Sequence, residues 1–351
     1  MPSASTRLGR ARALESLVRE IARDEILPRY LKTARNRKSD GSLFTEADIE
    51  SQRKLAEALP NLAAGSVLGE EMNPEEQARV WKAGRKGLWC IDPIDGTTNF
   101  ANGIPFFCVS VAYLVDHEPR FGVVYNPVTD ESFFAAKGAG AFLNGVELPL
   151  RSPAPVLADA VAGVDFKRIS HHLGDELAVR PPYYSQRNFG SSALEWCFVA
   201  AGRLDVYIHG GQMLWDYAAG QLILAEAGGQ AAALDGGSLS AGSAPGRAGR
   251  STTATGMAPM ASLRIRSSAS SAVTASQITV APTSPMNRAS AVPAPPNPPR
   301  DLAALGLLSG RCRACRAISP PASPAFGPYG LDIRSANSET PRMRSMARES
   351  W

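Results

Sequence analysis

The feature that most constrains this chain is residues 89–100, which read Trp-Cys-Ile-Asp-Pro-Ile-Asp-Gly-Thr-Thr-Asn-Phe. Residues 88–91 are short and apolar, which is typical of a buried strand, and they lead directly into Asp92 and Asp95. The proline between the two acids excludes a helix, so the chain is expected to turn there. Carboxylates at a strand end can bind a hard cation, and the glycine and threonines that follow can open a helix whose N–H groups bind phosphate.

The same sequence also allows a simpler interpretation. Asp-Pro-x-Asp-Gly is an ordinary turn sequence, and a short motif has a real rate of chance matches. Taken alone, these residues leave a structural turn and a metal site equally open, so the decision depends on the rest of the chain.

Length and composition limit the class of protein. A chain of 351 residues is long enough for one large domain or two small ones with a sizeable core. The charged N-terminus lacks the apolar segment of a signal peptide, and no run of about 18 apolar residues predicts a membrane span. Cys90, Cys108 and Cys197 lie in apolar runs, which predicts buried thiols in a cytoplasmic protein. Cys312 and Cys315 have redox or zinc spacing, but no second pair accompanies them.

Charge is distributed unevenly along the chain. Residues 238–351 contain 13 Arg, no Lys and 4 acidic residues, a net charge of +9. Because the whole chain carries +4, residues 1–237 carry −5. The basic character therefore belongs to the C-terminal segment, and it predicts nucleic-acid binding for that segment at most.

Apolar spacing and turn residues predict the elements of the first 237 residues. Asn144-Gly145 is a strong hairpin signal, and the strands around it form an antiparallel meander. Helices are expected at about 5–31, 45–59, 73–84, 191–201 and 214–226, and strands at 67–68, 88–91, 108–115, 121–125, 131–136, 141–144, 161–166, 204–208 and 230–234.

Asp48 has two interpretations. Thr45 followed three residues later by Asp48 is a capping-box pattern, so the carboxylate can simply stabilise the start of a helix. It can also reach a metal from that helix start. Capping is the favoured interpretation of this residue from the sequence.

The segment after residue 237 differs from the rest. It is rich in Ser, Ala, Pro and Arg, and residues 291–299 are dense in proline. Such a composition buries too little apolar area to offset the entropy of ordering, so we expect residues 238–351 to be mostly disordered. Because Arg without Lys is what another reading frame of a GC-rich gene encodes, we hypothesise that a frameshift replaced the C-terminus.

Five acids recur at strand ends or helix starts: Asp48, Glu70, Asp92, Asp95 and Asp216. Such positions can converge in one cleft, where the carboxylates would repel one another without cations. Magnesium is therefore expected, because it prefers carboxylate, water and phosphate oxygens.

The order and spacing of three blocks resemble the inositol monophosphatase family: residues 69–71, residues 92–100 and Trp215-Asp216 with the Ala-Ala-Gly that follows. The resemblance covers about residues 5–237. It implies a Mg²⁺-dependent phosphomonoesterase with an α+β or α/β fold, the layered αβαβα sandwich of the inositol monophosphatase and fructose-1,6-bisphosphatase type. Residues 1–150 would form the metal-binding half of this phosphatase domain, and residues 151–237 the second half.

The resemblance also implies roles for individual residues. Glu70, Asp92, the Ile94 carbonyl and Thr97 would surround a first metal, and Asp92, Asp95 and Asp216 a second, with Asp48 supporting a third beside Glu70. Thr97 and Glu70 would orient and deprotonate the attacking water. The substrate would be held by Asp95, the Gly96 and Thr97 amides, Asp216 and Ser192. Lys38 is a further match to the family.

Two departures from the family pattern concern the substrate and the C-terminus. His209 replaces a glutamate that contacts inositol hydroxyls in animal members, so it would be a substrate contact or a surface-loop residue. The further strand and C-terminal helix of the family are not evident after residue 237. A homodimer is expected from the resemblance alone.

Three functions remain open from the sequence. The first is a phosphatase for a small phosphorylated substrate, inositol 1-phosphate by default, with fructose bisphosphate, histidinol phosphate and adenosine 3′,5′-bisphosphate as alternatives used by relatives. The second is a non-catalytic regulatory protein whose Arg-rich segment binds RNA. The third is a folded but inactive product of the frameshift.

Overall fold

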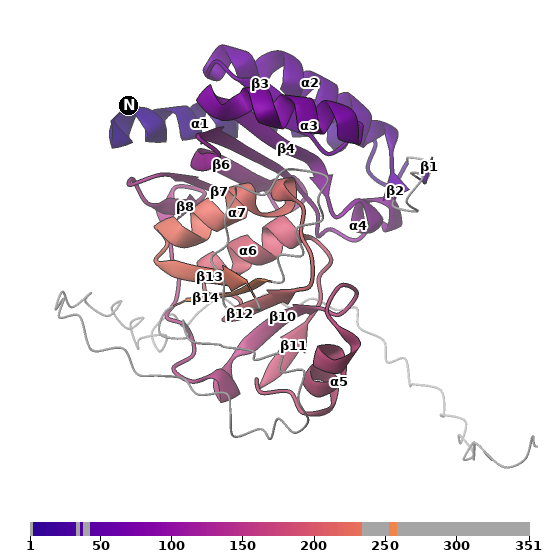
Figure 1. Ribbon diagram of the computed structural model, residues 1–351, viewed down its shortest axis with the longest axis vertical. Helices are drawn as coiled ribbons and strands as arrows, with labels where there is room; N and C mark the ends of the chain where they lie inside the picture. The colour runs from indigo at the N-terminus through magenta and orange to yellow at the C-terminus, as the bar shows by residue number, and fades with distance from the viewer. Residues whose placement is uncertain (1–2, 33–35, 38–42, 234–252, 258–351) are drawn as a thin grey trace, which may run out of the picture. The chain divides into compact units, whose positions relative to one another are not determined.

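Two large β-sheets alternate with three layers of helices in the computed structural model, which describes residues 3–32, 36–37, 43–233 and 253–257. A third, two-stranded sheet pairs residues 36–37 with residues 43–44. All of these residues belong to one unit, Met1–Met286. Helices α1 (Ala4–Ile21) and α2 (Glu46–Leu62) cover one face of a seven-stranded sheet (Figure 1). Helices α6 (Ser192–Ala200) and α7 (Leu214–Glu226) lie between that sheet and a five-stranded one, and α5 (His171–Val179) covers the outer face of the five-stranded sheet. The layered αβαβα sandwich predicted from the sequence is confirmed.

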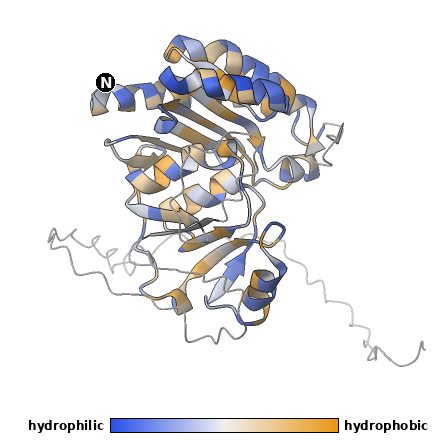
Figure 2. Ribbon diagram, viewed as in Figure 1, coloured by the Kyte–Doolittle hydropathy of each residue, from blue (hydrophilic) through white to orange (hydrophobic). Residues whose placement is uncertain are grey.

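The outer helices form because their apolar residues recur on one face. Helix α1 (Ala4–Ile21) begins at Ser3, whose hydroxyl accepts a hydrogen bond from the Thr6 amide, and it buries Leu14 and Val18 against the large sheet. It continues as a π-helical turn, Ala22–Ile26. Helix α2 (Glu46–Leu62) packs beside it. Figure 2 shows hydrophilic residues along these helices, as expected for a layer with one face in water.

The seven-stranded sheet is the predicted meander with one parallel strand added at its edge. Strands β3 and β4 are parallel, and every later pair is antiparallel. Asn144 and Gly145 both have positive φ, 49° and 85°, so the predicted hairpin turn is confirmed. In spatial order the strands are β3 (Ser66–Gly69), β4 (Leu88–Asp95), β5 (Cys108–Val115), β6 (Glu118–Asn126), β7 (Glu131–Ala136), β8 (Ala141–Leu143) and β9 (Val146–Glu147).

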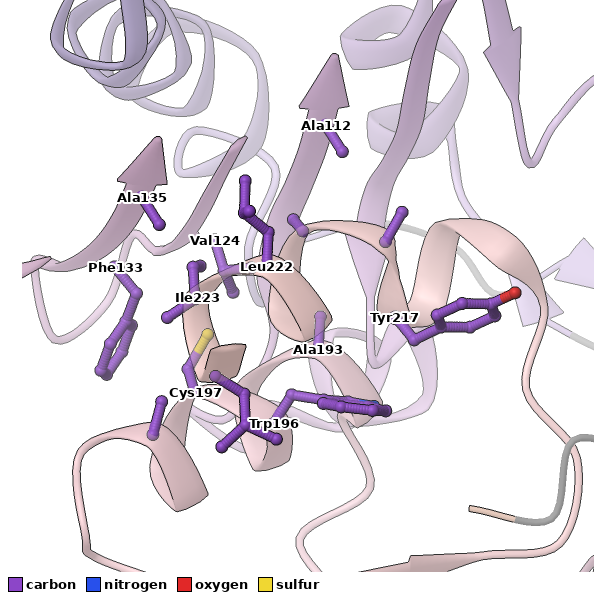
Figure 3. Packing of buried hydrophobic residues seen from close by; sticks show 14 of the residues in the cluster. Ala112, Val124, Phe133, Ala135, Ala193, Trp196, Cys197, Tyr217, Leu222 and Ile223 are labelled. Carbon is purple, nitrogen blue, oxygen red and sulfur yellow. The ribbon is translucent and has the colours of Figure 1, made fainter. Parts of the chain in front are cut away.

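The inner layer consists of α6 (Ser192–Ala200) and α7 (Leu214–Glu226), which are apolar on nearly all sides because sheets cover both faces. Figure 3 shows Trp196 and Cys197 of α6 beside Leu222 and Ile223 of α7, with Val124 and Ala135 of the large sheet close by. All six residues belong to the hydrophobic core between the sheets.

The five-stranded sheet has the order β11-β10-β12-β14-β13. Its parallel strands are β10 (Val161–Asp165), β11 (Ser185–Arg187) and β12 (Val206–His209), and helix α5 (His171–Val179) packs on them. Strand β14 (Thr253–Met257) pairs antiparallel with β12 on one side and β13 (Gly229–Ala233) on the other. The expectation of no further strand after residue 237 is therefore wrong, because a short Thr-containing segment among Ser, Ala and Gly residues gave no visible periodicity.

Other parts of the predictions are corrected or lie outside the described residues. Strand β4 does not end at residue 91 but runs to Asp95. The remaining described elements are β1 (Asn36–Arg37), β2 (Leu43–Phe44), α3 (Pro74–Ala83), α4 (Thr97–Asn102) and two short 3-10 helical turns, Gly84–Lys86 and Leu157–Asp159. In the described ranges no helix combines the length and apolar character that a membrane crossing needs. Lys38, Cys312, Cys315 and the Arg-rich segment beyond Met257 lie outside the described residues, so the predicted disorder, the frameshift and the domain boundary stay predictions.

Candidate metal centre

Three carboxylates converge where β4 ends beside the start of α7. Asp92, Asp95 and Asp216 each offer an oxygen within 4.8 Å of the others. The first two close β4, and the third lies in the first turn of α7, a helix in contact with β4. The predicted convergence of five acids is thus confirmed for these three.

An irregularity in β4 explains how two acids three residues apart reach one point. In a regular strand, residues i and i+3 face opposite sides of the sheet. The pairing of β4 with β5 shifts register between Asp92 and Asp95, and the Ile94 amide donates a 3.0 Å hydrogen bond to Asp92 Oδ1. The proline in this segment therefore bends the strand instead of ending it, as a bulge does.

Asp95 is fixed by the start of α6. Ser191 Oγ donates to Asp95 Oδ2 at 2.7 Å, and the Ala193 amide donates to the same oxygen at 2.6 Å. Burial raises the pKa of Asp95 to about 6, although these hydrogen bonds lower it in part. The carboxylate is therefore held in one orientation before any ligand binds.

Asp92 and Asp216 complete a site of strong negative potential. Burial and the charge of Glu70 raise the pKa of Asp92, and burial with the charge of Asp95 raises the pKa of Asp216. The Met213 amide donates to Asp216 Oδ2 at 2.8 Å and thereby caps α7. Asp92 and Asp95 are buried and Asp216 is partly exposed. Carboxylates that repel one another at such a site, with only oxygen donors, fit a hard divalent cation.

Glu70 and Asp48 approach this centre from the neighbouring elements. Glu70 follows β3, is partly exposed, and forms a hydrogen bond with Asp92 that contributes to the raised pKa of that acid. Asp48 is buried in α2 and accepts hydrogen bonds from the Thr45 amide (2.7 Å) and hydroxyl (2.6 Å). The capping role predicted for Asp48 is confirmed.

Asp48 also contacts the other side of the centre. Thr97 Oγ1 lies 3.3 Å from Asp48 Oδ1 and 3.0 Å from the Ile94 carbonyl oxygen. Burial, with the charges of Glu71 and Glu70, raises the pKa of Asp48 to about 7 against its hydrogen bonds from Thr45. Capping and proximity to the site are thus properties of the same carboxyl group.

Gly96 shapes the turn into α4. Its φ of 93° favours glycine, and an added Cβ would lie 3.2 Å from the Phe106 carbonyl oxygen and 3.2 Å from Ser191 Cβ. The glycine therefore allows the backbone of this turn to approach the start of α6 closely.

His209 and Ser192 lie on the side of the five-stranded sheet. His209 is 3% exposed; its Nε2 lies 3.2 Å from Asp165 Oδ2, and its Nδ1 accepts a hydrogen bond from the Gly211 amide. The surface-loop interpretation of His209 is therefore wrong, and its contact with substrate stays a prediction. Ser192 is the first residue of α6 and is hydrogen-bonded to Tyr207 and Gln212.

Sequence reasoning missed several polar residues around the centre. Ser191 donates a hydrogen bond to Asp95, and Asp165 forms an ion pair with His209 when the histidine is protonated. Glu195 and Tyr207 are buried close to Ser192. Glu195 carried a usable signal, since it is the lone acid in the otherwise apolar helix Ser192–Ala200. The others had none, because only the fold brings them to the site.

Comparison with known proteins gives a consistent result. The sequence model of the inositol monophosphatase family matches residues 9–270. Inositol monophosphatase 2 of Solanum lycopersicum is 44% identical over 149 residues, 40% of this chain and 56% of the relative. Inositol-1-monophosphatase of Rhizobium meliloti is 35% identical over 217 residues, 59% of this chain and 78% of the relative.

The solved structures agree in fold. The IMPase of Thermotoga maritima superposes with a TM-score of 0.61 at 28% identity, covering 71% of this chain and 92% of that one. Several curated relatives are matched over only 56% to 64% of their own length. The family match nevertheless extends over most of the chain and includes the metal centre and β14. The chain therefore belongs to the inositol monophosphatase family.

Proposed function

We propose that this protein is a Mg²⁺-dependent phosphomonoesterase for a small phosphorylated substrate, with inositol 1-phosphate as the default. The observation that carries the proposal is the cluster of Asp92 and Asp95, which are buried, with the partly exposed Asp216, whose ligand oxygens lie within 4.8 Å of one another and whose negative charges a divalent cation would balance. A structure of SaIMPase-II with bound inositol monophosphate has the same fold, with a TM-score of 0.56 at 25% identity over 70% of this chain and 87% of that one.

The site residues fit the metal in number and chemistry. Glu70, Asp92, the Ile94 carbonyl and Thr97 would hold one Mg²⁺; Asp92, Asp95 and Asp216 a second; and Asp48 would support a third. When bound, Mg²⁺ supplies charge neutralisation for the phosphate and lowers the pKa of a water ligand.

The chain itself would orient the reactants. The Thr97 hydroxyl has one proton, which goes to Asp48 or to the Ile94 carbonyl, so its oxygen is left to accept a hydrogen bond from the attacking water. Glu70 would take the proton of that water. The Gly96 and Thr97 amides would bind the phosphate, and Asp95, Asp216, Ser192 and His209 would face the rest of the substrate.

The test is phosphate release with and without Mg²⁺ from inositol 1-phosphate, fructose bisphosphate, histidinol phosphate and adenosine 3′,5′-bisphosphate. Asp95→Asn should reduce kcat/KM by roughly 10²-fold or more, because a ligand charge disappears while the side-chain shape is kept. Glu147→Gln, an exposed acid on β9, is the matched control and should retain the wild-type rate. A folded protein that releases no phosphate from any of the four would overturn the proposal.

A regulatory role is the second candidate, because some relatives carry a regulatory name. Nus factor SuhB of Pasteurella multocida is 40% identical over 154 residues, 42% of this chain and 57% of the relative. The Arg-rich residues 238–351 would then bind RNA with a strong salt dependence. Filter binding of the full chain and of residues 1–257 to RNA separates the candidates, since only this role predicts binding that is lost with the segment.

A further inference from the structure

A buried chain of hydrogen bonds connects Glu195 with Ser192 at the metal centre. Glu195 is 1% exposed and is hydrogen-bonded to the Tyr207 hydroxyl. Tyr207 Oη in turn lies 3.3 Å from Ser192 Oγ, which also contacts Gln212 Nε2. The proposed function uses Ser192 but assigns nothing to Glu195, Tyr207 or Gln212.

Trp196 determines the direction of one of these bonds. Its indole Nε1 lies 3.3 Å from Gln212 Oε1, and an indole N–H can only donate. The oxygen of the Gln212 amide must therefore face Trp196, and its nitrogen must face Ser192. Because an amide nitrogen only donates, Ser192 Oγ uses one lone pair to accept from Gln212.

The protonation of Glu195 determines the direction of the other bonds. A neutral Glu195 donates to Tyr207 Oη, so Tyr207 donates its proton to Ser192. Both lone pairs of Ser192 Oγ are then filled, and its own O–H is left to donate elsewhere. An ionised Glu195 only accepts, so Tyr207 turns its proton to Glu195, and the Tyr207 oxygen becomes an acceptor that draws the Ser192 proton to itself.

The position of Ser192 indicates where its free O–H points. Its two sequence neighbours, Ser191 and Ala193, both donate to Asp95 at the metal centre. Ser192 is partly exposed, whereas both neighbours are buried. An O–H released by the network therefore lies at the start of α6, beside the proposed phosphate site.

We propose that Glu195 is a positioning residue that, through Tyr207, sets the Ser192 hydroxyl as a hydrogen-bond donor to an oxygen of the bound substrate. The inference rests on the proposed function for the identity of the substrate. It adds that the donor exists while Glu195 is protonated and is lost when Glu195 ionises.

The residues around Glu195 set the pH at which it ionises, and this pH can be reached in an activity assay. Burial raises its pKa to about 8, the Phe189 amide lowers it, and the charges of Asp95 and Asp165 raise it. The sequence of β14 has no titratable residue. The other elements packed around α6 also carry titratable or charged residues, namely Cys108 and Tyr113 on β5, Glu118, Arg120 and Tyr125 on β6, His209 on β12, and Asp216, Tyr217 and Glu226 on α7. With this pKa the neutral form is the main one at pH 7 in the metal-free protein, and a cation bound to Asp95 would offset the part of the shift that Asp95 causes.

The experiment is to measure KM and kcat of the Mg²⁺-saturated full chain from pH 7 to pH 9, where a phosphate monoester keeps its charge. The wild-type KM should rise by roughly fivefold, as expected for one lost hydrogen bond, with little change in kcat. Glu195→Gln should show no such rise: the Phe189 amide donates to Glu195 Oε1 at 3.4 Å, so the glutamine oxygen stays there and its NH₂ donates to Tyr207 at every pH.

Two further variants test the connection. Ser192→Ala should have a raised KM that no longer depends on pH above 7, and Glu195→Gln should change nothing further in that background. Tyr207→Phe removes the acceptor that competes for the Ser192 proton, so its KM should stay near the wild-type value at pH 7 over the whole range. Glu147→Gln should follow the wild-type profile. If Mg²⁺-dependent release is present but Glu195→Gln keeps the wild-type pH dependence, the inference is wrong; if the wild type releases no phosphate, the proposed function itself fails.

Discussion

At the scale of single residues, the sequence predicted the carboxylates of the metal centre but not the residues that form hydrogen bonds around them. Asp92, Asp95 and Asp216 stand in recognisable sequence blocks, and the structure brings their oxygens together. Ser191 donates to Asp95 from a distance of 96 residues, and Tyr207 reaches Ser192 from 15 residues away. Serine and tyrosine are common residues, so nothing in their local sequence marks these partners.

The anchor of Asp95 provides a prediction at this scale. Ser191→Ala removes the 2.7 Å hydrogen bond that orients the carboxylate, and we expect a roughly 10-fold weaker Mg²⁺ affinity, the lower end for loss of a ligand's supporting partner. Calorimetric titration with Mg²⁺ measures this directly. Ser16→Ala on the exposed part of α1 is the matched control, and equal affinities for the two variants would contradict the role of Ser191.

At the scale of elements, regular periodicity was predictable and irregular pairing was not. The outer helices and the meander carry clear apolar spacing, so their existence follows from the sequence. The extension of β4 to Asp95 depends on a register shift against β5. Strand β14 forms because its backbone pairs with β12 on one side and with β13 on the other. Both are decided by partners distant in sequence, which local patterns do not report.

The contact between α6 and α7 gives a prediction about packing. A Cβ added at Gly220 would lie 2.5 Å from Trp196 Cβ, so Gly220→Ala forces the two helices apart and should reduce the free energy of unfolding by about 1–3 kcal/mol. At Gly9 of α1, an added Cβ meets no atom within 4 Å, so Gly9→Ala should stabilise by up to about 1 kcal/mol. Urea denaturation of both variants checks the sign of each change.

At the scale of the whole molecule, the buried acids couple stability to pH and to the metal. The pKa values of Asp95, Asp48 and Glu195 are raised to about 6, 7 and 8. The folded protein therefore binds more protons than the unfolded chain, and the stability linked to these groups is lost as pH rises from about 4 through 8. A shift of about two pKa units, as at Asp95 and the carboxylates coupled to it, corresponds to about 3 kcal/mol of this loss.

We therefore expect the metal-free protein to unfold at a lower temperature at pH 8 than at pH 5. Added Mg²⁺ should raise the unfolding temperature more at pH 8, because it binds the ionised site of the folded state. Differential scanning calorimetry with chelator and with Mg²⁺ at both pH values tests this. An equal effect of Mg²⁺ at the two pH values would show that these carboxylates do not form its site.

The position of β14 has a consequence for how the chain is made. The last strand of the large sheet ends at Glu147, so all seven of its strands can pair as soon as that part of the chain has left the ribosome. The five-stranded sheet must wait for Thr253–Met257, since β13 pairs only with β14 among the described strands. At the usual speed of translation these residues follow roughly 5–20 s later. During that interval the nascent chain has a complete seven-stranded sheet, while the edge of β12 that later pairs with β14 is still unpaired. We expect a chaperone or a protease to bind at this edge.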